Sequence, residues 1–222
     1  MKKLLYGLTV LAALLASCAK DNYTPPSSTL KGRVVYQNRP VGVRSDGVQL
    51  ELWQSGYQLY TKIPVYVDQD GSFSASLFDG DYKLVLLRGN GPWVDNTDTL
   101  RVNVKGATLV DVPVQPYYTV AGEAYKKSGT TFTATCRVNQ VVTSRAIERV
   151  TFYLGSTQFV DLNNNVAKAD LTGSALSDLS KDLTFTLPMP AGVNKNYLYG
   201  RIGVKTVGVA EMLYSPVQEI KW

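Results

Sequence analysis

The feature that most constrains this chain is a two-residue alternation of apolar and polar side chains, repeated in short runs from Leu30 to the C-terminus. In one run Val48, Leu50 and Leu52 share a face, and turn-forming residues separate this run from the next. Such runs are typical of β-strands with one buried face. No stretch keeps a helical repeat for more than a few turns. The sequence therefore predicts an all-β protein.

Two consecutive series of alternating runs divide the chain into two expected domains. Residues 30–115 contain seven predicted strands, among them a hairpin that turns at residues 68–71. Residues 116–222 contain a second series, with strands predicted at residues 132–138, 150–154, 183–187, 197–207 and 212–222. We therefore expect two consecutive antiparallel β-sandwich domains. Because almost no linker separates them, the expected interface between the domains is fixed rather than flexible.

The amino-acid composition excludes many catalytic mechanisms. The chain contains no histidine, which removes Ser-His-Asp and Cys-His nucleophiles and every metal site with histidine ligands. It lacks the Gly-x-Ser-x-Gly motif of serine hydrolases. No spacing singles out a pair of carboxylates for glycoside cleavage. We expect a protein that is not an enzyme and has no catalytic residue, metal site or cofactor.

Charge and acidic motifs point to neither nucleic acid nor calcium. The formal net charge of +5 is scattered along the chain, without the basic stripe that binds phosphates. Asp68 and Asp70 form an Asp-x-Asp-Gly sequence that is part of a calcium-loop pattern, but no Glu follows at the twelfth position. A plain turn is therefore the prediction for this sequence.

Residues 1–17 have the proportions of a signal peptide. Lys2 and Lys3 precede an apolar run over residues 4–15, which is too short to span a bilayer as a helix. The run ends in Leu-Ala-Ser-Cys, which resembles the bacterial lipobox, so Cys18 is the predicted lipidation site. An ordinary signal peptide with an unrelated cysteine is the alternative. Residues 18–29 are polar and contain proline, and are predicted to form a flexible tether.

Three segments of the first predicted domain carry a family resemblance. They are residues 32–35 (Gly-Arg-Val-Val), the turn at residues 68–73 (Asp-Gln-Asp-Gly-Ser-Phe) and residues 78–84 (Phe-Asp-Gly-Asp-Tyr-Lys-Leu). Together they resemble the carboxypeptidase regulatory-like domain. This resemblance implies a transthyretin-like (prealbumin-like) sandwich over residues 30–115, followed by an immunoglobulin-like sandwich over residues 116–222.

Further segments extend the resemblance over the chain that follows the signal peptide. They are residues 89–94, 114–117, 199–205 and 213–216. With the lipobox, they are similar to a Bacteroidota family of lipoproteins of unknown function. Its members commonly occur beside glycan import systems of a TonB-dependent porin and a starch-utilisation-type binding lipoprotein. The resemblance implies this setting and brings no established active site.

Aromatic side chains are the best candidates for a binding function, because 14 Tyr and 3 Trp are many for this length. Flat ring faces stack on sugars while polar neighbours bind the hydroxyl groups. Trp93 lies in a Gly- and Pro-containing loop with Asp95 and Asn96, and Trp53 points away from the core of its strand with Tyr57 close by. These five residues are the predicted carbohydrate site. As alternatives, Trp93 plugs the end of the sandwich and Trp53 fills the interface between the domains.

Four other residues are expected to be structural. Cys136 shares the parity of apolar neighbours, so we expect a buried thiol without reactivity. Tyr117 and Tyr118 lie at the domain junction and are expected to pack there. Arg201 is expected to be an ion-pair partner at an edge or an interface.

The resulting hypothesis is a non-catalytic lipoprotein of the outer membrane, facing the cell surface, that binds a polysaccharide or oligosaccharide and assists its capture by a TonB-dependent import complex. The alternative is a structural module that packs on other envelope proteins. The periplasmic face of the membrane is the alternative location. On the binding hypothesis, Trp93→Ala abolishes carbohydrate retention and changes the free energy of unfolding by less than about 1 kcal/mol.

Overall fold

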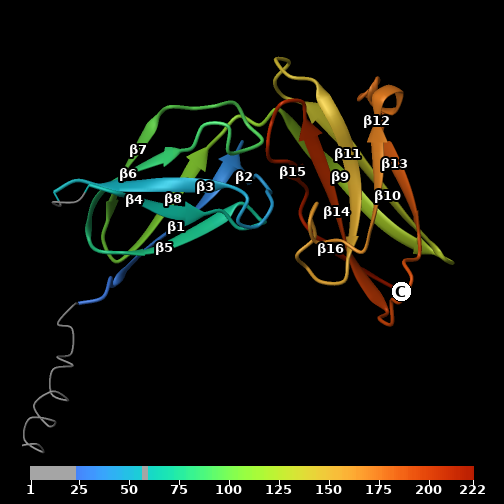
Figure 1. The fold of residues 1–222 in the computed structure, drawn as a ribbon, viewed down its shortest axis with the longest axis horizontal. Helices are drawn as coiled ribbons and strands as arrows, with labels where there is room; N and C mark the ends of the chain where they lie inside the picture. The colour runs from blue at the N-terminus through green and yellow to red at the C-terminus, as the bar shows by residue number, and fades with distance from the viewer. Residues whose placement is uncertain (1–23, 57–59) are drawn as a thin grey trace, which may run out of the picture.

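The computed structural model describes residues 24–56 and 60–222, which form two β-sandwich domains placed end to end (Figure 1). Within these residues the regular structure is almost entirely β, with one short 3₁₀ helix, η1 (Gly173–Leu176). The predictions of an all-β chain and of two sandwich domains are confirmed. In the described part of the chain no helix has the length and apolar character needed to cross a membrane. The predicted signal peptide and Cys18 lie outside the described residues.

The first domain consists of two facing sheets of four strands each. One sheet has β1 at its centre, paired with β2, β5 and β8, and the other has the order β4-β3-β6-β7. The strands are β1 (Ser28–Tyr36), β2 (Arg39–Pro40), β3 (Gln49–Gln54), β4 (Lys62–Tyr66), β5 (Ser72–Leu77), β6 (Gly80–Leu86), β7 (Thr99–Val104) and β8 (Ala107–Pro113).

Several details of the first domain differ from the sequence prediction. The two-residue strand β2 was not among the seven predicted strands. β1 pairs with β8 in parallel, so the sheet is not purely antiparallel. The reason is that the chain crosses between the sheets after β7 and returns beside its own first strand. β1 also begins at Ser28, where Ser28 and Thr29 pair with Leu77 and Ser76 of β5. The predicted tether is therefore too long by these two residues.

The alternating residues of the first domain meet between its sheets, as their parity predicts. Val48, Leu50 and Leu52 are at most 1% exposed. Tyr82 and Leu84 of β6 join the same apolar core. The turn at residues 68–71 joins β4 to β5, which lie in different sheets, so the predicted hairpin is wrong although the turn is present. In this turn Gly71 has a φ of 85°, a left-handed conformation that favours glycine.

The second domain packs a three-stranded sheet, β13-β10-β9, against a five-stranded sheet in which β11 and β14 are central. Phe132, Cys136, Phe152 and Phe185 are among the side chains that fill its core. The strands are β9 (Tyr118–Ser128), β10 (Thr131–Gln140), β11 (Ile147–Gly155), β12 (Ala167–Thr172), β13 (Leu183–Pro188), β14 (Tyr197–Thr206), β15 (Leu213–Tyr214) and β16 (Gln218–Lys221).

Two strands of the second domain, β9 and β12, were not predicted. Both alternate between half-buried and exposed residues, and Ala167 and Ala169 of β12 are small. Their apolar signal is weak because they lie at the edges of the two sheets, where one side of the strand faces water. By contrast, the expected packing of Tyr117 and Tyr118 at the junction is confirmed, since both are buried in the second core.

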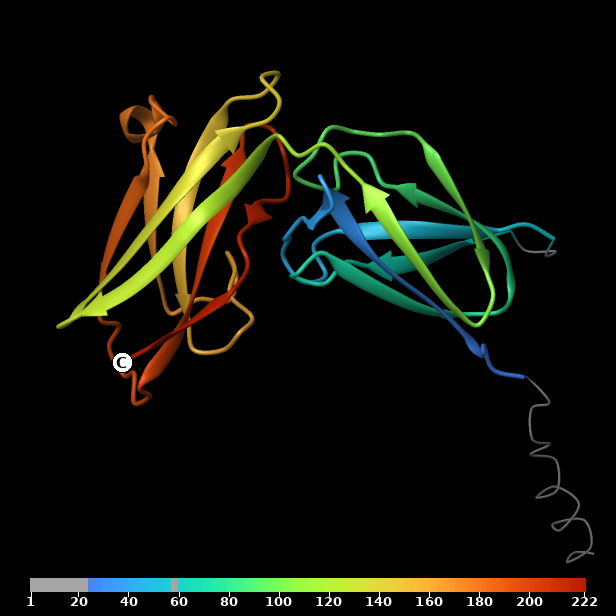
Figure 2. The same ribbon diagram turned by 180° about the vertical axis from the view of Figure 1, so that it is seen from behind.

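The two domains meet where β15 and the loops around it face β2 and the turns of the first domain (Figures 1 and 2). Tyr214 of β15 donates its backbone N–H to the carbonyl of Gly42, over 2.9 Å. Arg44 forms an ion pair with Glu211 across the junction, at 2.7 Å. Gln69 donates a hydrogen bond to the carbonyl of Gln158. Backbone, charged and amide contacts therefore all join the domains.

Arg201 of β14 is the central residue of this junction, and it is 1% exposed. Its guanidinium donates to the carbonyls of Ser215 and Val160 in the second domain, at 2.9 and 3.0 Å. It also donates to the carbonyls of Val43 and Gln69 in the first domain, at 3.0 and 2.6 Å. One side chain thus binds four carbonyl oxygens from both domains.

The environment of Arg201 corrects the expected ion pair. Among the described residues no carboxylate lies within ion-pair distance of its guanidinium, which instead stacks over the Tyr214 ring at 4.5 Å. Burial lowers the pKa of Arg201 to about 10, so the side chain remains charged at neutral pH. The prediction that Arg201 lies at an interface is confirmed, and the prediction that it forms an ion pair is wrong. Its partners are backbone carbonyls, which every residue has, so the sequence does not indicate them.

We expect Arg201→Met to destabilise the protein by about 4 kcal/mol, because it leaves buried carbonyls of both domains without a donor. The measurement is urea unfolding of the soluble form that starts after Cys18. Arg33→Met is the matched control, since Arg33 forms an exposed ion pair with Asp111 and should change stability by less than about 1 kcal/mol. Equal unfolding midpoints for the two variants would contradict the role of Arg201.

The Cys136 thiol is 1% exposed, and its burial, with smaller effects of Glu123 and Asp182, raises its pKa to about 12. Only the thiolate reacts rapidly with disulfide reagents. We therefore expect no labelling of the folded soluble form by a thiol reagent at pH 8, and complete labelling in guanidinium. Stoichiometric labelling of the folded protein would show that the second core opens.

Candidate functional site

The acidic turn at residues 68–71 is a structural turn, as predicted. Asp70 accepts hydrogen bonds from the backbone N–H and the hydroxyl of Ser72, at 2.9 and 2.7 Å. The N–H of Gly71 binds the carbonyl of Asp68. Within the described ranges no group of three or more potential acidic or cysteine ligands could hold a metal ion.

Trp93 is buried, with 3% of its surface exposed, and it packs in the core of the first domain. Its loop is fixed beside the segment that leads to the second domain: Val94 donates to the carbonyl of Gln115, and Tyr117 donates to that of Pro92. Both faces of the ring are therefore unavailable to a sugar. The prediction of Trp93 as a carbohydrate contact is wrong, and its alternative, a packing role, fits the structure.

Asp95 and Asn96 serve the shape of their own loop. The Asp95 carboxylate accepts the N–H of Gly89 at 2.7 Å, and the Asn96 side-chain oxygen accepts the N–H of Asp98 at 2.8 Å. Such local bonds stabilise turns. These two residues lie beside a buried Trp93 and apart from the hollow that contains Trp53, so the predicted five-residue site is not assembled.

Trp53 is half-buried on the outer face of the sheet β4-β3-β6-β7. The strand register places Lys62 of β4 on one side of it and Lys83 of β6 on the other, and Arg101 of β7 follows Lys83. Register partners in a sheet project to the same face. Trp53 therefore lies in a transverse row with three cations.

Glu51 holds the Trp53 ring in place. Its carboxylate accepts the indole N–H of Trp53 at 3.1 Å and pairs with Lys62 at 2.7 Å. Although its side chain points away from the core, Glu51 is only 7% exposed, since these two neighbours cover it. The orientation of the indole is therefore set before any ligand binds.

A hollow of about 500 Å³ lies beside Trp53. Tyr60 is 51% exposed, and its ring lies 5.1 Å from that of Trp53, tilted by 39°. Tyr57 lies outside the described residues. The side chains that border the hollow include Trp53, Ser55, Tyr60, Asp81, Lys83, Arg101 and Asn103.

Sequence reasoning identified Trp53 but missed the polar residues of this hollow. Lys83 and Arg101 have the parity of outward-facing residues, which was the available signal. That signal does not say which strands are neighbours. The pairing of β3 with β6, and of β6 with β7, brings the cations to Trp53.

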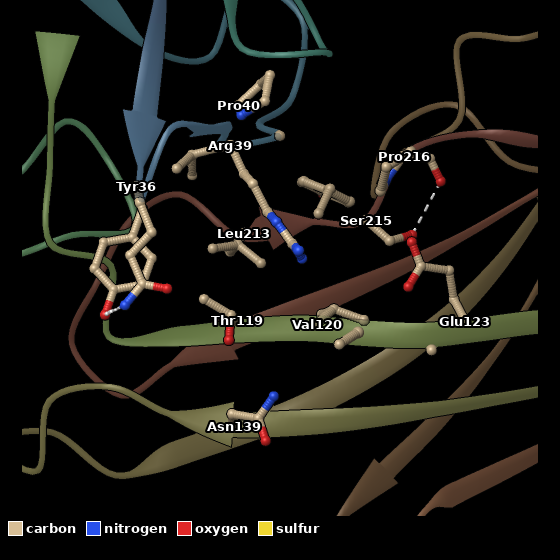
Figure 3. Close-up of a pocket in the computed structure, with 16 residues that line it drawn as sticks. Tyr36, Arg39, Pro40, Thr119, Val120, Glu123, Asn139, Leu213, Ser215 and Pro216 are labelled. Carbon is tan, nitrogen blue, oxygen red and sulfur yellow. Dashed lines mark hydrogen bonds between the residues drawn. The ribbon is translucent and has the colours of Figure 1, made fainter.

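A second hollow, of about 550 Å³, lies in the groove between the two domains. Figure 3 shows Arg39 extending from β2 into this groove, with Thr119 and Asn139 on the opposite wall. Tyr36 also lines this groove, and its hydroxyl accepts a hydrogen bond from the side chain of the adjacent Gln37. Much of the remaining lining is apolar: Pro40, Val41, Val120, Leu213 and Pro216. The groove thus offers an apolar surface, whereas the Trp53 hollow combines ring faces with charged groups.

We expect Trp93→Ala to lower the free energy of unfolding by about 3–5 kcal/mol, because it leaves a cavity in the first core. This reverses the small effect predicted from the sequence. Trp222→Ala is the control, since Trp222 is 37% exposed and should cost about 1 kcal/mol. Chemical unfolding of both variants measures the difference, and equal losses would mean that Trp93 is not a core residue.

Both domains of the chain match models of a known protein family. Residues 28–115 match the model described as the N-terminal domain of the protein of unknown function DUF3823, and residues 118–219 match its C-terminal domain, DUF3823_C. No curated protein matches the chain. The matched models describe no catalytic activity.

Solved structures give the same result. A DUF3823 family protein from Bacteroides ovatus ATCC 8483 is 39% identical, with a TM-score of 0.81, over 87% of this chain and 98% of that one. One from Parabacteroides merdae ATCC 43184 is 37% identical, with a TM-score of 0.81, over 89% of this chain and 100% of that one.

A third structure shares the fold at lower identity. It is described as a "putative carbohydrate binding protein" from Bacteroides uniformis ATCC 8492, and is 21% identical, with a TM-score of 0.72, over 89% of this chain and 100% of that one. At this identity the similarity concerns the fold alone. From the two matched models and the two nearer relatives, the chain belongs to the DUF3823 family.

Proposed function

We propose that this protein binds carbohydrate, without cleaving it, at the hollow beside Trp53 and Tyr60. The observation that carries the proposal is the pair of neighbouring rings, 5.1 Å apart, one half-buried and held by Glu51 and one 51% exposed. A ring that is fixed before binding loses little conformational entropy when a sugar stacks on it. The rings would provide the apolar surface for the pyranose.

The polar groups around the rings suit the edges of a sugar. Asp81 and Asn103 are exposed, and Asn103 donates to the Asp81 carboxylate at 2.7 Å. Among the described residues this leaves Asp81 with further acceptor capacity, and the amide oxygen of Asn103 accepts no hydrogen bond. Sugar hydroxyls both donate and accept, so acceptors and donors beside a ring face form a suitable binding edge.

The proposed place of binding is the outer membrane, with Cys18 as the lipid anchor. Nine residues separate Cys18 from Ser28, where β1 begins, and the ten Cα–Cα steps between them reach at most about 35 Å. The chain enters the first domain at the end that points away from the second domain (Figure 1). At that end the Ser28 hydroxyl donates a hydrogen bond to the Asp79 carboxylate and accepts one from the N–H of Gly106. The tether therefore enters close to the ends of β6 and β7 that carry Asp81 and Asn103.

In this arrangement the protein would retain polysaccharide near the membrane and assist its transfer to a TonB-dependent import complex. The sequence resemblance to lipoproteins found beside such systems supports this role. The described carbohydrate-binding character of the Bacteroides uniformis neighbour is consistent with it. A non-catalytic role is consistent with the family, for which no catalytic activity is described.

The test is native affinity electrophoresis of the soluble form that starts after Cys18, in gels containing plant, host or microbial polysaccharides. One class of glycan should retard the protein. We expect Trp53→Ala and Tyr60→Ala each to weaken retention at least about tenfold, since each removes a stacking surface.

Tyr66→Ala is the matched control. Tyr66 is also 51% exposed and lies on the outer face of β4, but it pairs with Gln49 rather than with Trp53. Retention that persists in Trp53→Ala and is lost in Tyr36→Ala would move the site to the groove between the domains. No retention by any glycan would overturn carbohydrate binding and favour the alternative, a module that packs on other envelope proteins.

A further inference from the structure

The row of side chains across the outer sheet face carries more positive charge than a neutral sugar requires. It runs Lys62, Trp53, Lys83, Arg101 from β4 to β7. Lys62 is neutralised by Glu51 at 2.7 Å. This leaves Lys83 and Arg101 on the side of Trp53 that borders the hollow.

Neither of these two cations has a partner among residues 24–56 and 60–222. In the part of the chain that the structure describes, the side chains of Lys83 and Arg101 make no ion pair and no hydrogen bond. Both are exposed and both border the hollow. Two neighbouring cations without a carboxylate repel each other weakly, and an anion between them removes that repulsion.

The acidic residue that borders the hollow is Asp81, and its position does not cancel the cations. It is opposite Asn103 in the strand register and accepts a hydrogen bond from that amide. It lies beyond ion-pair distance of Lys83 and Arg101. The charge at the hollow is therefore arranged as two free cations beside the rings, with one amide-bound carboxylate at the margin.

We infer that the glycan bound at Trp53 and Tyr60 is anionic, with a carboxylate or a sulfate between Lys83 and Arg101. The inference rests on the proposed function and names its substrate class. An arginine binds either oxyanion through two parallel N–H donors, and a lysine adds a point charge. The rings bind the sugar body, and the two cations select the acidic sugar over its neutral counterpart.

The experiment compares each anionic polysaccharide with its own neutral form. Polygalacturonate is compared with its fully methyl-esterified form, and dextran sulfate with dextran, by affinity electrophoresis of the soluble form. We expect at least one anionic form to bind about tenfold more tightly than its neutral counterpart. The first pair reports a carboxylate and the second a sulfate. The preference should weaken as salt is raised to 0.5 M, because the cations are exposed.

The double variant Lys83→Gln, Arg101→Gln should lose the preference for the anionic form while it keeps its fold. The control is the double variant Lys126→Gln, Lys168→Gln, which removes the same charge from the second domain, where both lysines are exposed. It should keep the preference. An equal loss in both double variants would mean general attraction of a basic protein to a polyanion, and would overturn the inference.

The two proposals fail in different ways. If neutral and anionic forms bind equally, and Trp53→Ala abolishes both, the anionic preference is wrong and carbohydrate binding stands. If no polysaccharide in either pair or in the wider panel is retained, carbohydrate binding itself is wrong. Retention of the anionic form that survives Trp53→Ala would place the anion elsewhere and contradict the inference.

Discussion

The buried charge of Arg201 is the interaction on which the arrangement of the two domains depends. A guanidinium removed from water costs free energy unless its donors are satisfied. In this protein its donors reach four backbone carbonyls, two from each domain, and its face covers the Tyr214 ring. Those carbonyls belong to turns and loops, so the same contact that stabilises the charge fixes the segments on both sides of the junction. The backbones of the two domains approach each other so closely at Gly42 that no side chain fits there: a Cβ would lie 2.5 Å from the Tyr214 carbonyl oxygen.

This junction decides which surfaces remain free for binding. It occupies one end of the first sandwich and forms the apolar groove in which Arg39 and Tyr36 lie. The outer face of β4-β3-β6-β7 is not part of it, so Trp53 and Tyr60 stay accessible. Glu51 then restricts Trp53 in the way that Arg201 restricts the domain junction: a buried charge accepts or donates defined hydrogen bonds and fixes an orientation.

Trp93 and Trp53 illustrate how far the sequence predicted the site. Trp93 lies in a loop rich in Gly, Pro and polar residues, a context typical of an exposed binding loop. The loop instead forms backbone hydrogen bonds with residues 115–117, and these bonds direct the Trp93 ring into the core. Strand parity placed Trp53 correctly on an outer face, because alternation is a local property of the chain. The cations beside it depend on which strands pair, and no local pattern contains that information.

The sequence by itself determined the β-strands with strong alternation, the positions that fill both cores, the turn at Gly71 and the burial of Cys136. These follow from the period of two and from turn chemistry, which act between near neighbours in the chain. Tertiary structure alone decided the parallel pairing of β1 with β8, the carbonyl cradle of Arg201, and the meeting of Trp53 with Lys83 and Arg101. Each of these three features joins residues that are distant in the chain, through backbone groups or through strand register. Backbone contacts and strand register do not depend on particular side chains, so no sequence pattern reports them.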